Sequence, residues 1–457
     1  LCDVFVTSGF GTALIQKKEI SVTDYNTAFW LSFTISVVLY FALFVSAPYI
    51  AKFYETELLT PVVRVFGIRL VLTSINTIQT AKVQREMAFK KFFVSTFAGT
   101  VLSCAVGVGM AYAGYGVWAL VAQYLSNTII STALFSFVCG WQPKFQFSWQ
   151  KAKDIWRFGS RVLGASLIST GTLELQNLMI GKCFGAADLA VMDQGKKYPA
   201  LLVNNVNSSI NKVMLPFFSK TQDSMKELKE SLRRIVKLST FLLSPILLGF
   251  FAVTPVFIEV FLTLKWSACI PYLRIFCIMF LTRPLTTICH QALLAINKAE
   301  IAMYLMIIIN LVALVGAFLS AILIEELLFV AIFLLIADLV ALIGFMIAMK
   351  VYLSWHFKEQ LADITLPILI SAIMCVCVCF LPCIINVSRV LLLVLQIVAG
   401  AVIYIGLSAL FRVDSFVWFL TKLKAIIDKM EKEGPSERVL TKYYVINGTI
   451  FEAPDLY

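Results

Sequence analysis

Long apolar runs recur along almost the whole of this chain, and they constrain its fold more than any other feature. Each is continuously apolar over about 20 residues, enough for a helix to cross a hydrocarbon layer of roughly 30 Å, whereas a membrane β-barrel shows alternating segments of about 10 residues. Of the 457 residues, 60% are hydrophobic and 14% are charged, against about 25% charged in a typical soluble domain. We therefore predict an all-α, polytopic membrane protein.

Breaks between the apolar runs delimit the expected transmembrane helices. These cover residues 27–52, 61–80, 94–113, 117–138, 160–181, 195–217, 238–263, 268–293, 301–322, 327–349, 364–385 and 388–411. Residues 1–15 resemble the end of a further span, and the chain begins with Leu rather than Met. We expect about 12 to 13 spans and a truncated N-terminus.

The formal charge of +11 is spread over short loops rather than along one soluble face, which favours the positive-inside rule over nucleic-acid binding. The basic loops carry Lys17, Lys18, Lys82, Arg85, Lys90, Lys91, Lys144, Lys151, Lys153, Arg157, Lys220, Lys226, Lys229, Arg233 and Arg234. The loops between them carry Glu55, Glu57, residues 114–116, Asp188, Glu325 and Glu326. We expect the first set in the cytoplasm and the second outside.

The two halves of the chain resemble each other. Residues 46–79 parallel residues 253–291, with Pro48 aligned with Pro255 and Arg64 with Arg274. Both segments follow a basic loop, so they share an orientation, and this predicts two parallel lobes that suit alternating access. Chance similarity between apolar segments is the alternative.

This organisation predicts five regions. They are an N-terminal transmembrane lobe, incomplete at its start (1–138), a cytoplasmic linker (139–159), a C-terminal transmembrane lobe (160–349), two additional C-terminal transmembrane helices (350–411), and a cytoplasmic amphipathic stretch with a tail (412–457). The last region begins with a basic, partly amphipathic segment typical of a membrane surface.

Metal and redox chemistry are not indicated. Most of the 11 cysteines lie inside apolar runs, where a thiol behaves as a small hydrophobic group. The chain has only 2 histidines, so a His-based metal or catalytic site is not expected. We predict no metal and no cofactor.

Several dispersed motifs resemble the polysaccharide transporter (Wzx-type) flippases of the multidrug/oligosaccharidyl-lipid/polysaccharide flippase superfamily. The resemblance covers roughly residues 1–415 and is carried by DVFVTSGFGTALIQKKEISVTDYNTAFW (3–30), GYGVWALVAQ (114–123), WQPKF (141–145), LMIGKCFG (178–185), NNVNSSINKVMLPFFSKTQD (204–223) and LKWSACIPYLRIFCI (264–278). Thr7 and Met192 depart from the family's pattern, which weakens the transfer of individual residue roles.

The resemblance implies two six-helix lobes and two extra C-terminal helices. It also implies a flippase that moves undecaprenyl-pyrophosphate-linked oligosaccharide units across the inner membrane for O-antigen, capsule or exopolysaccharide. The implied partners are that lipid-linked oligosaccharide, membrane lipids, and the glycosyltransferases and polymerase of the same pathway, with no nucleic acid.

Two other functions stay open: a multidrug or lipid II exporter of the same superfamily, and a membrane-embedded glycosyltransferase or polymerase. An enzyme would need catalytic carboxylates beside a wet groove and usually a long outward loop, and the expected outward loops are short. A drug exporter should favour an acidic, aromatic cavity. We therefore predict a transporter and not an enzyme.

The expected span 195–217 is the best candidate for the wall of a polar cavity. It is too polar for a lipid-facing helix, and Lys197, Asn204, Ser208 and Asn211 fall on one helical face, next to Lys196. Cations and amides of this kind suit a pyrophosphate and sugar hydroxyls. Hydrogen bonding between helices is the alternative.

Five further residues are candidates because ionisable or amide groups inside a membrane are costly. Arg69 and Arg283 lie well within expected spans and are assigned to the substrate's phosphates. Glu174, Asn177 and Asp338 are assigned to a coupling ion. The alternatives are pairing with a basic residue for Glu174 and Asn177, and a structural pair for Asp338.

Overall fold

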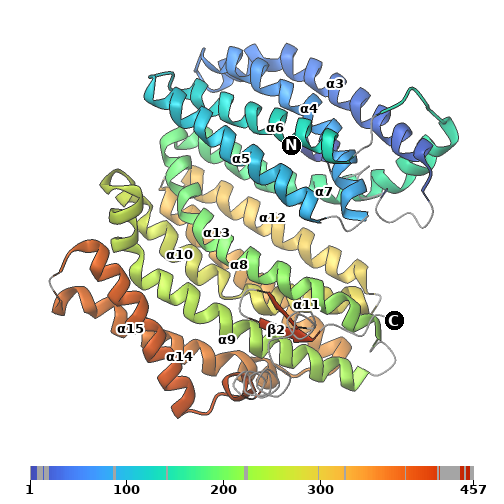
Figure 1. Ribbon diagram of the computed structural model, residues 1–457. Coiled ribbons are helices and arrows are strands. Elements are labelled where there is room, and N and C mark those ends of the chain that lie inside the picture. Colours follow the sequence, from blue (N-terminus) through green and yellow to red (C-terminus); the bar gives the residue numbers. More distant parts are fainter. Residues whose placement is uncertain are drawn as a thin grey trace, which may run out of the picture. The chain divides into compact units, whose positions relative to one another are not determined.

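The computed structural model describes residues 2–7, 14, 20–85, 89–139, 143–220, 225–296, 298–323, 326–385, 387–418, 421, 443–446 and 449–452. The chain divides into two compact units, Leu1–Leu175 and Gln176–Tyr457. In Figure 1 each unit is a bundle of long helices.

The first unit contains α1 (Cys2–Thr7), α3 (Val22–Phe53), α4 (Leu59–Arg85), α5 (Phe89–Tyr112) and α6 (Val117–Cys139), together with most of α7 (Trp149–Cys183). Helices α5 and α6 are joined by a tight turn. Between α5 and α6 the chain reverses at Gly114 and Gly116, whose φ angles are +84° and +54°, a conformation that glycine adopts without steric cost.

The second unit contains the end of α7, α8 (Ala186–Lys220), α9 (Met225–Phe257), a π-helical turn (Ile258–Leu262), a 3-10 helix (Leu264–Cys269), α10 (Ile270–Phe280), α11 (Arg283–Ala295), α12 (Ala299–Leu323), α13 (Leu327–Leu353), α14 (Phe357–Ile384) and α15 (Arg389–Leu410). Helix α9 is central, and packs against α14, α15, α10 and α11. Strands β1 (Tyr443–Ile446) and β2 (Thr449–Glu452) form a short antiparallel hairpin.

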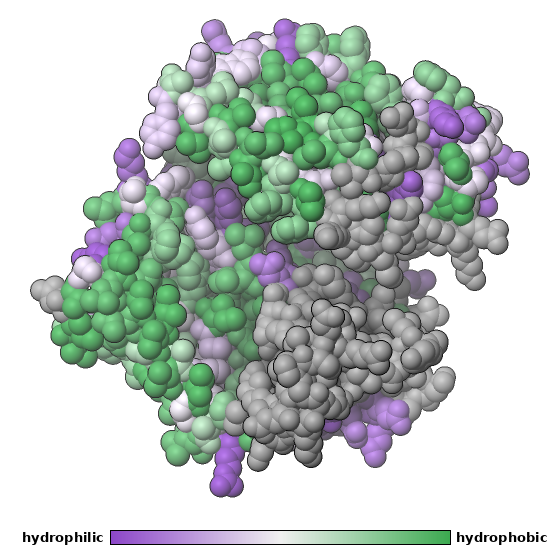
Figure 2. Space-filling model, in the orientation of Figure 1, coloured by the Kyte–Doolittle hydropathy of each residue, from purple (hydrophilic) through white to green (hydrophobic). Residues whose placement is uncertain are grey.

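The prediction of an all-α, polytopic membrane protein is confirmed. Among the described residues, 9 helices are long and apolar enough to cross a membrane, and the number is 10 if α10 and α11, which meet at a bend, cross together. The remaining two expected spans, 160–181 and 195–217, lie within α7 and α8, which are not among these 9 helices and therefore remain predicted spans. Apolar side chains cover much of the visible surface in Figure 2, as expected of a surface that faces lipid.

A shared contact supports the predicted repeat. In the first unit the guanidinium of Arg64 on α4 lies 4.3 Å from the ring centroid of Phe44 on α3. In the second unit the guanidinium of Arg274 on α10 lies 5.1 Å from the ring centroid of Phe251 on α9. Each phenylalanine precedes the aligned proline by one helical turn, so the same cation–π contact recurs at equivalent positions.

The loop before α7 is attached to the start of α3. The Trp30 indole donates a hydrogen bond to the Lys144 carbonyl at 3.1 Å, and the Lys144 amide donates to the Asn26 side chain at 3.2 Å. Buried Asp24 forms an ion pair with Lys151 at 3.3 Å. The linker expected over 139–159 is therefore held, in its described part, by the first unit.

Candidate functional site

The candidate site of the second unit lies at a break in a transmembrane helix. Residues 268–293 were expected to form one continuous span, but α10 ends at Phe280 and α11 begins at Arg283, with a bend of 42°. Pro284 explains the break, because it has no backbone N–H to donate to the Phe280 carbonyl and its ring clashes with that carbonyl. The break places polar groups inside an otherwise apolar bundle.

Asp338 of α13 is directed at this break. Its Oδ1 lies 3.1 Å from Nη2 of Arg283, and its other carboxylate oxygen accepts a hydrogen bond from the Thr282 hydroxyl. The Asp338 side chain is 10% exposed and that of Arg283 is 41% exposed. Sequence reasoning assigned Arg283 to the substrate and Asp338 to a coupling ion, with a structural pair as the alternative for Asp338. The structure pairs Asp338 with Arg283.

Lys196 of α8 completes the cluster. It is half-buried and lies within electrostatic range of Arg283, Asp338 and Asp193. The preceding residue, Gly195, allows α8 to approach α10 closely, because a Cβ atom there would lie 2.7 Å from Cβ of Tyr272. The glycine thus brings Lys196 close to the helix that ends at the break.

The remaining candidates on α8 have a different environment. The side chains of Lys197 and Asn204 are exposed and share one face of the helix. The side chains of Ser208 and Asn211 lie outside the described residues, although their backbone belongs to α8. In the described part of the predicted polar wall, Lys197 and Asn204 are therefore exposed and Lys196 is half-buried.

In the first unit, Arg69 of α4 is also paired. Its Nη1 lies 3.4 Å from Oδ2 of Asp3 on α1, and its guanidinium lies 5.7 Å and 5.8 Å from the ring centroids of Phe66 and Tyr124. Arg69 is therefore held beside a carboxylate and two aromatic rings.

The two ion-coupling candidates on α7 are less defined. Glu174 and Asn177 are both half-buried and lie one helical turn apart. Among the described residues, Glu174 makes no ion pair. The geometry adds nothing to the sequence-based assignment of either residue.

Sequence reasoning missed a ladder of ion pairs between α9 and α14. Arg233 binds Asp363 through Nε and Nη2, at 2.7 Å and 2.9 Å, while Lys229 lies 2.7 Å from Glu359. Lys237 lies 2.8 Å from Asp414 and 3.6 Å from Asp363. The sequence did contain a signal for these pairs. Lys229, Arg233 and Lys237 are spaced four residues apart and share one face of α9, and Glu359 and Asp363 are spaced four residues apart on one face of α14.

A polar interface between α4, α5 and α6 was also missed. The Gln79 side chain donates to the Ser136 hydroxyl at 2.8 Å, and the Asn127 side chain donates to the Ser103 hydroxyl at 3.1 Å. Such amide and hydroxyl groups hold transmembrane helices together, so we assign this interface to helix packing within the first unit.

Comparison with known proteins identifies sequence relatives. Residues 1–271 match the sequence model of a family described as "polysaccharide biosynthesis protein". The chain is 26% identical over 306 residues to the teichuronic acid biosynthesis protein TuaB of Bacillus subtilis, a match covering 66% of this chain and 63% of TuaB. It is 23% identical over 304 residues to the lipopolysaccharide biosynthesis protein WzxC of Escherichia coli, covering 66% and 62%. The chain thus spans less than two thirds of the length of these relatives.

Solved structures share the fold. The lipid II flippase MurJ in an inward closed conformation superposes with a TM-score of 0.74, covering 90% of each chain at 14% identity. An inward-facing multidrug transporter of the MATE family and MOP superfamily gives a TM-score of 0.61, covering 79% of this chain and 87% of that transporter at 14% identity. At such identities the likeness concerns the fold alone.

Proposed function

This chain belongs to the polysaccharide biosynthesis protein family, and on that premise we propose that it flips undecaprenyl-pyrophosphate-linked oligosaccharide units across the inner membrane for O-antigen, capsule or exopolysaccharide synthesis. The observation that carries the proposal is the cluster of Lys196, Arg283 and Asp338 at the helix break. A translocated pyrophosphate needs cations within the membrane, and cations there are costly unless they serve such a pathway.

The cluster suits a substrate that carries phosphate. Arg283 is held by Asp338 when no anion is bound, so a phosphate would compete with the carboxylate for the same guanidinium. Lys196 adds a second cation within electrostatic range of this pair. Under this proposal the lipid's phosphates meet Lys196 and Arg283, and Asp338 becomes free to take up a coupling ion or proton.

The other sequence candidates have subsidiary roles in this proposal. Lys197, Asn204, Ser208 and Asn211 supply donors and acceptors to sugar hydroxyls along α8. Arg69 serves the substrate's phosphates in the first unit, and Glu174 and Asn177 serve the coupling ion. Transport proceeds by alternating access of two lobes, with the glycosyltransferases and polymerase of the pathway acting before and after it.

Lys196→Ala tests the proposal in a strain whose chromosomal gene is deleted. We expect surface polysaccharide to fall about tenfold at matched protein abundance, because a charge-assisted hydrogen bond to phosphate contributes about 1.5–3 kcal/mol. Lys196→Arg should retain part of the export, since it keeps the charge. The matched control is Lys226→Ala, an exposed cation in the first turn of α9. Export at the parental level in Lys196→Ala would refute the role of this cluster.

The charge pattern predicts an orientation that labelling can check. We expect a cysteine at Glu57 or Tyr115 to react with an impermeant maleimide in intact cells, and a cysteine at Arg85 to react only after the membrane is permeabilised. Lys151 and Arg233 should share the side of Arg85. Lys17 and Glu325, which belong to the same prediction, lie outside the described residues. Labelling of Arg85→Cys in intact cells would show that the predicted orientation in the membrane is wrong.

A further inference from the structure

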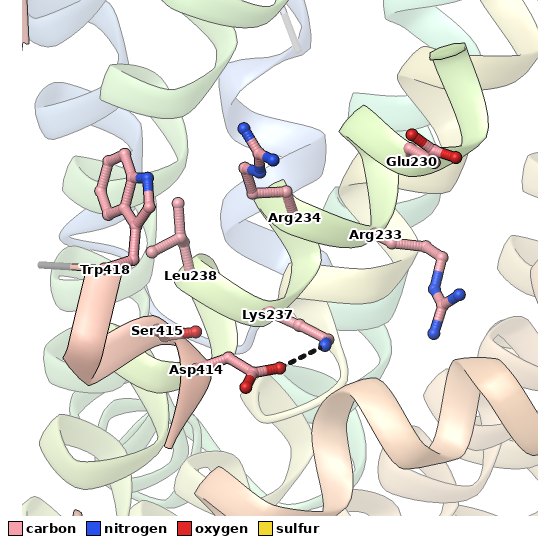
Figure 3. Close-up of a pocket in the computed structure, with 8 residues that line it drawn as sticks. All are labelled: Glu230, Arg233, Arg234, Lys237, Leu238, Asp414, Ser415 and Trp418. Carbon is pink, nitrogen blue, oxygen red and sulfur yellow. Dashed lines mark hydrogen bonds and ion pairs between the residues drawn. The ribbon is translucent and has the colours of Figure 1, made fainter. Parts of the chain in front are cut away.

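A charged cavity of about 360 Å³ lies beside the N-terminal part of α9, and none of its lining residues belongs to the cluster at the helix break. Figure 3 shows its lining. The lining residues are Glu230, Arg233, Arg234, Lys237, Leu238, Asp414, Ser415 and Trp418. They come from α9 and from the segment that follows α15.

The cations of this cavity are not equivalent. The guanidinium of Arg233 is bound by Asp363, and Lys237 lies between Asp363 and Asp414. Arg234 is exposed, and within the described part of the chain it makes no ion pair. In Figure 3 the Arg234 side chain extends away from Arg233, on the side of α9 where Trp418 lies. Arg234 is therefore a cation available for an external anion.

The cavity lies where polar helix ends meet apolar helix surfaces. Lys237 is the last basic residue before the apolar part of α9, and Asp414 lies four residues after the end of α15 at Leu410. Trp418 is half-buried beside them, and tryptophan is enriched at the depth of lipid headgroups. A ligand at this position would have its polar part at the membrane–water boundary.

An apolar groove of about 700 Å³ continues along the same helix. Its lining includes Pro245, Gly249, Val394 and Tyr404, from α9 and α15. Phe241 lies on α9 between Leu238 of the cavity and Pro245 of the groove. Its ring centroid lies 5.3 Å from that of Tyr404 in the groove, and its backbone carbonyl accepts a hydrogen bond from the Tyr404 hydroxyl at 2.8 Å. The charged cavity and the apolar groove thus follow one another along α9, with Phe241 between them.

We propose that this cavity binds the headgroup phosphate of an anionic phospholipid of the surrounding bilayer, with an acyl chain in the adjoining groove. Arg234 donates hydrogen bonds to the phosphate, and Lys237, which has three N–H donors and two carboxylate neighbours, supplies one more. Basic pockets between transmembrane helices at a membrane surface favour anionic headgroups. The linings of the cavity and the groove contain none of the residues proposed to bind the substrate, and lipid binding can be measured without flippase activity.

The test is native mass spectrometry of the purified full protein, titrated with long-chain phosphatidylglycerol and, separately, with phosphatidylcholine. We expect phosphatidylglycerol to bind more tightly, and Arg234→Gln to weaken its binding about fivefold. Glu230→Gln should tighten binding, because it removes a negative charge from the lining. An effect of this sign cannot come from misfolding.

Two control variants distinguish lipid binding at this site from a general loss of positive charge. Lys226→Gln removes an exposed cation of α9 outside the cavity lining and should leave the affinity unchanged. Gly249→Leu should fill the groove and weaken long-chain but not short-chain phosphatidylglycerol. The proposal would be overturned if the two lipids bound equally or if Arg234→Gln left the affinity unchanged. It would also be overturned if Lys226→Gln weakened binding as much as Arg234→Gln, or if inorganic phosphate alone bound as tightly as the lipid.

Discussion

Arg283→Ala should remove most polysaccharide export and also lower the abundance of the folded protein, and adding Asp338→Ala should restore the abundance but not the export. The single change leaves the carboxylate of Asp338, which is 10% exposed, without its cation. Breaking a buried pair from one side costs about 3–5 kcal/mol, and the partial exposure of Arg283 places this case at the lower end. The double change removes both charges and therefore most of that penalty.

The two readouts distinguish a structural pair from a transport site. Surface polysaccharide is compared with the amount of folded protein in the membrane, measured by fluorescence-detected gel filtration. A purely structural pair predicts that export recovers with abundance in the double variant. Recovery of export in Arg283→Ala/Asp338→Ala would exclude Arg283 from the substrate path, while leaving the fold unaffected.

Arg233→Ala should cause the largest loss of stability among single changes in the ladder between α9 and α14. Asp363 is 1% exposed and accepts two hydrogen bonds from Arg233. Alanine therefore leaves a buried carboxylate whose remaining cationic partner, among the described residues, is Lys237 at 3.6 Å. We expect a loss of about 3 kcal/mol, measured as a lower unfolding temperature of the purified protein. Arg233→Lys should lose less, because it keeps the charge but not the two-pronged geometry.

Lys226→Ala is the matched comparison, since Lys226 lies on the same helix and is exposed. Its unfolding temperature should stay at that of the parent protein. Arg233→Ala/Asp363→Asn should regain part of the lost stability, because a neutral amide no longer needs the cation. An unchanged unfolding temperature in Arg233→Ala would show that Lys237 alone compensates Asp363.

The transmembrane helices were predictable because a bilayer requires continuous apolar helices, and the apolar runs are visible in the sequence. The break at residues 281–282 was not predicted, although Pro284 is visible. Pro48, Pro245 and Pro367 lie inside helices that continue through them. A proline alone therefore does not distinguish a tolerated position from a break, because the outcome depends on how neighbouring helices satisfy the freed backbone groups.

The candidate site was predictable residue by residue but not as pairs. Arg69, Arg283 and Asp338 stand out because charges within apolar spans are costly. Their partners come from helices distant in sequence, Asp3 for Arg69 and Asp338 for Arg283, and spacing along one chain does not reveal such contacts. The ladder around Arg233 was hidden for another reason, because a basic helix end is already explained by membrane orientation.

The break between α10 and α11 also separates two sets of aligned peptide dipoles. The last carbonyl groups of α10 carry partial negative charge, and the first amide groups of α11 carry partial positive charge, equivalent to about half an elementary charge. Arg283 is the first residue of α11, where a cation is disfavoured by about 0.3–1 kcal/mol. The charge of Arg283 therefore destabilises the start of α11, and its ion pair with Asp338 offsets this cost. Because this backbone field remains when any single side chain is replaced, an approaching anion would still meet a positive helix end in Arg283→Ala.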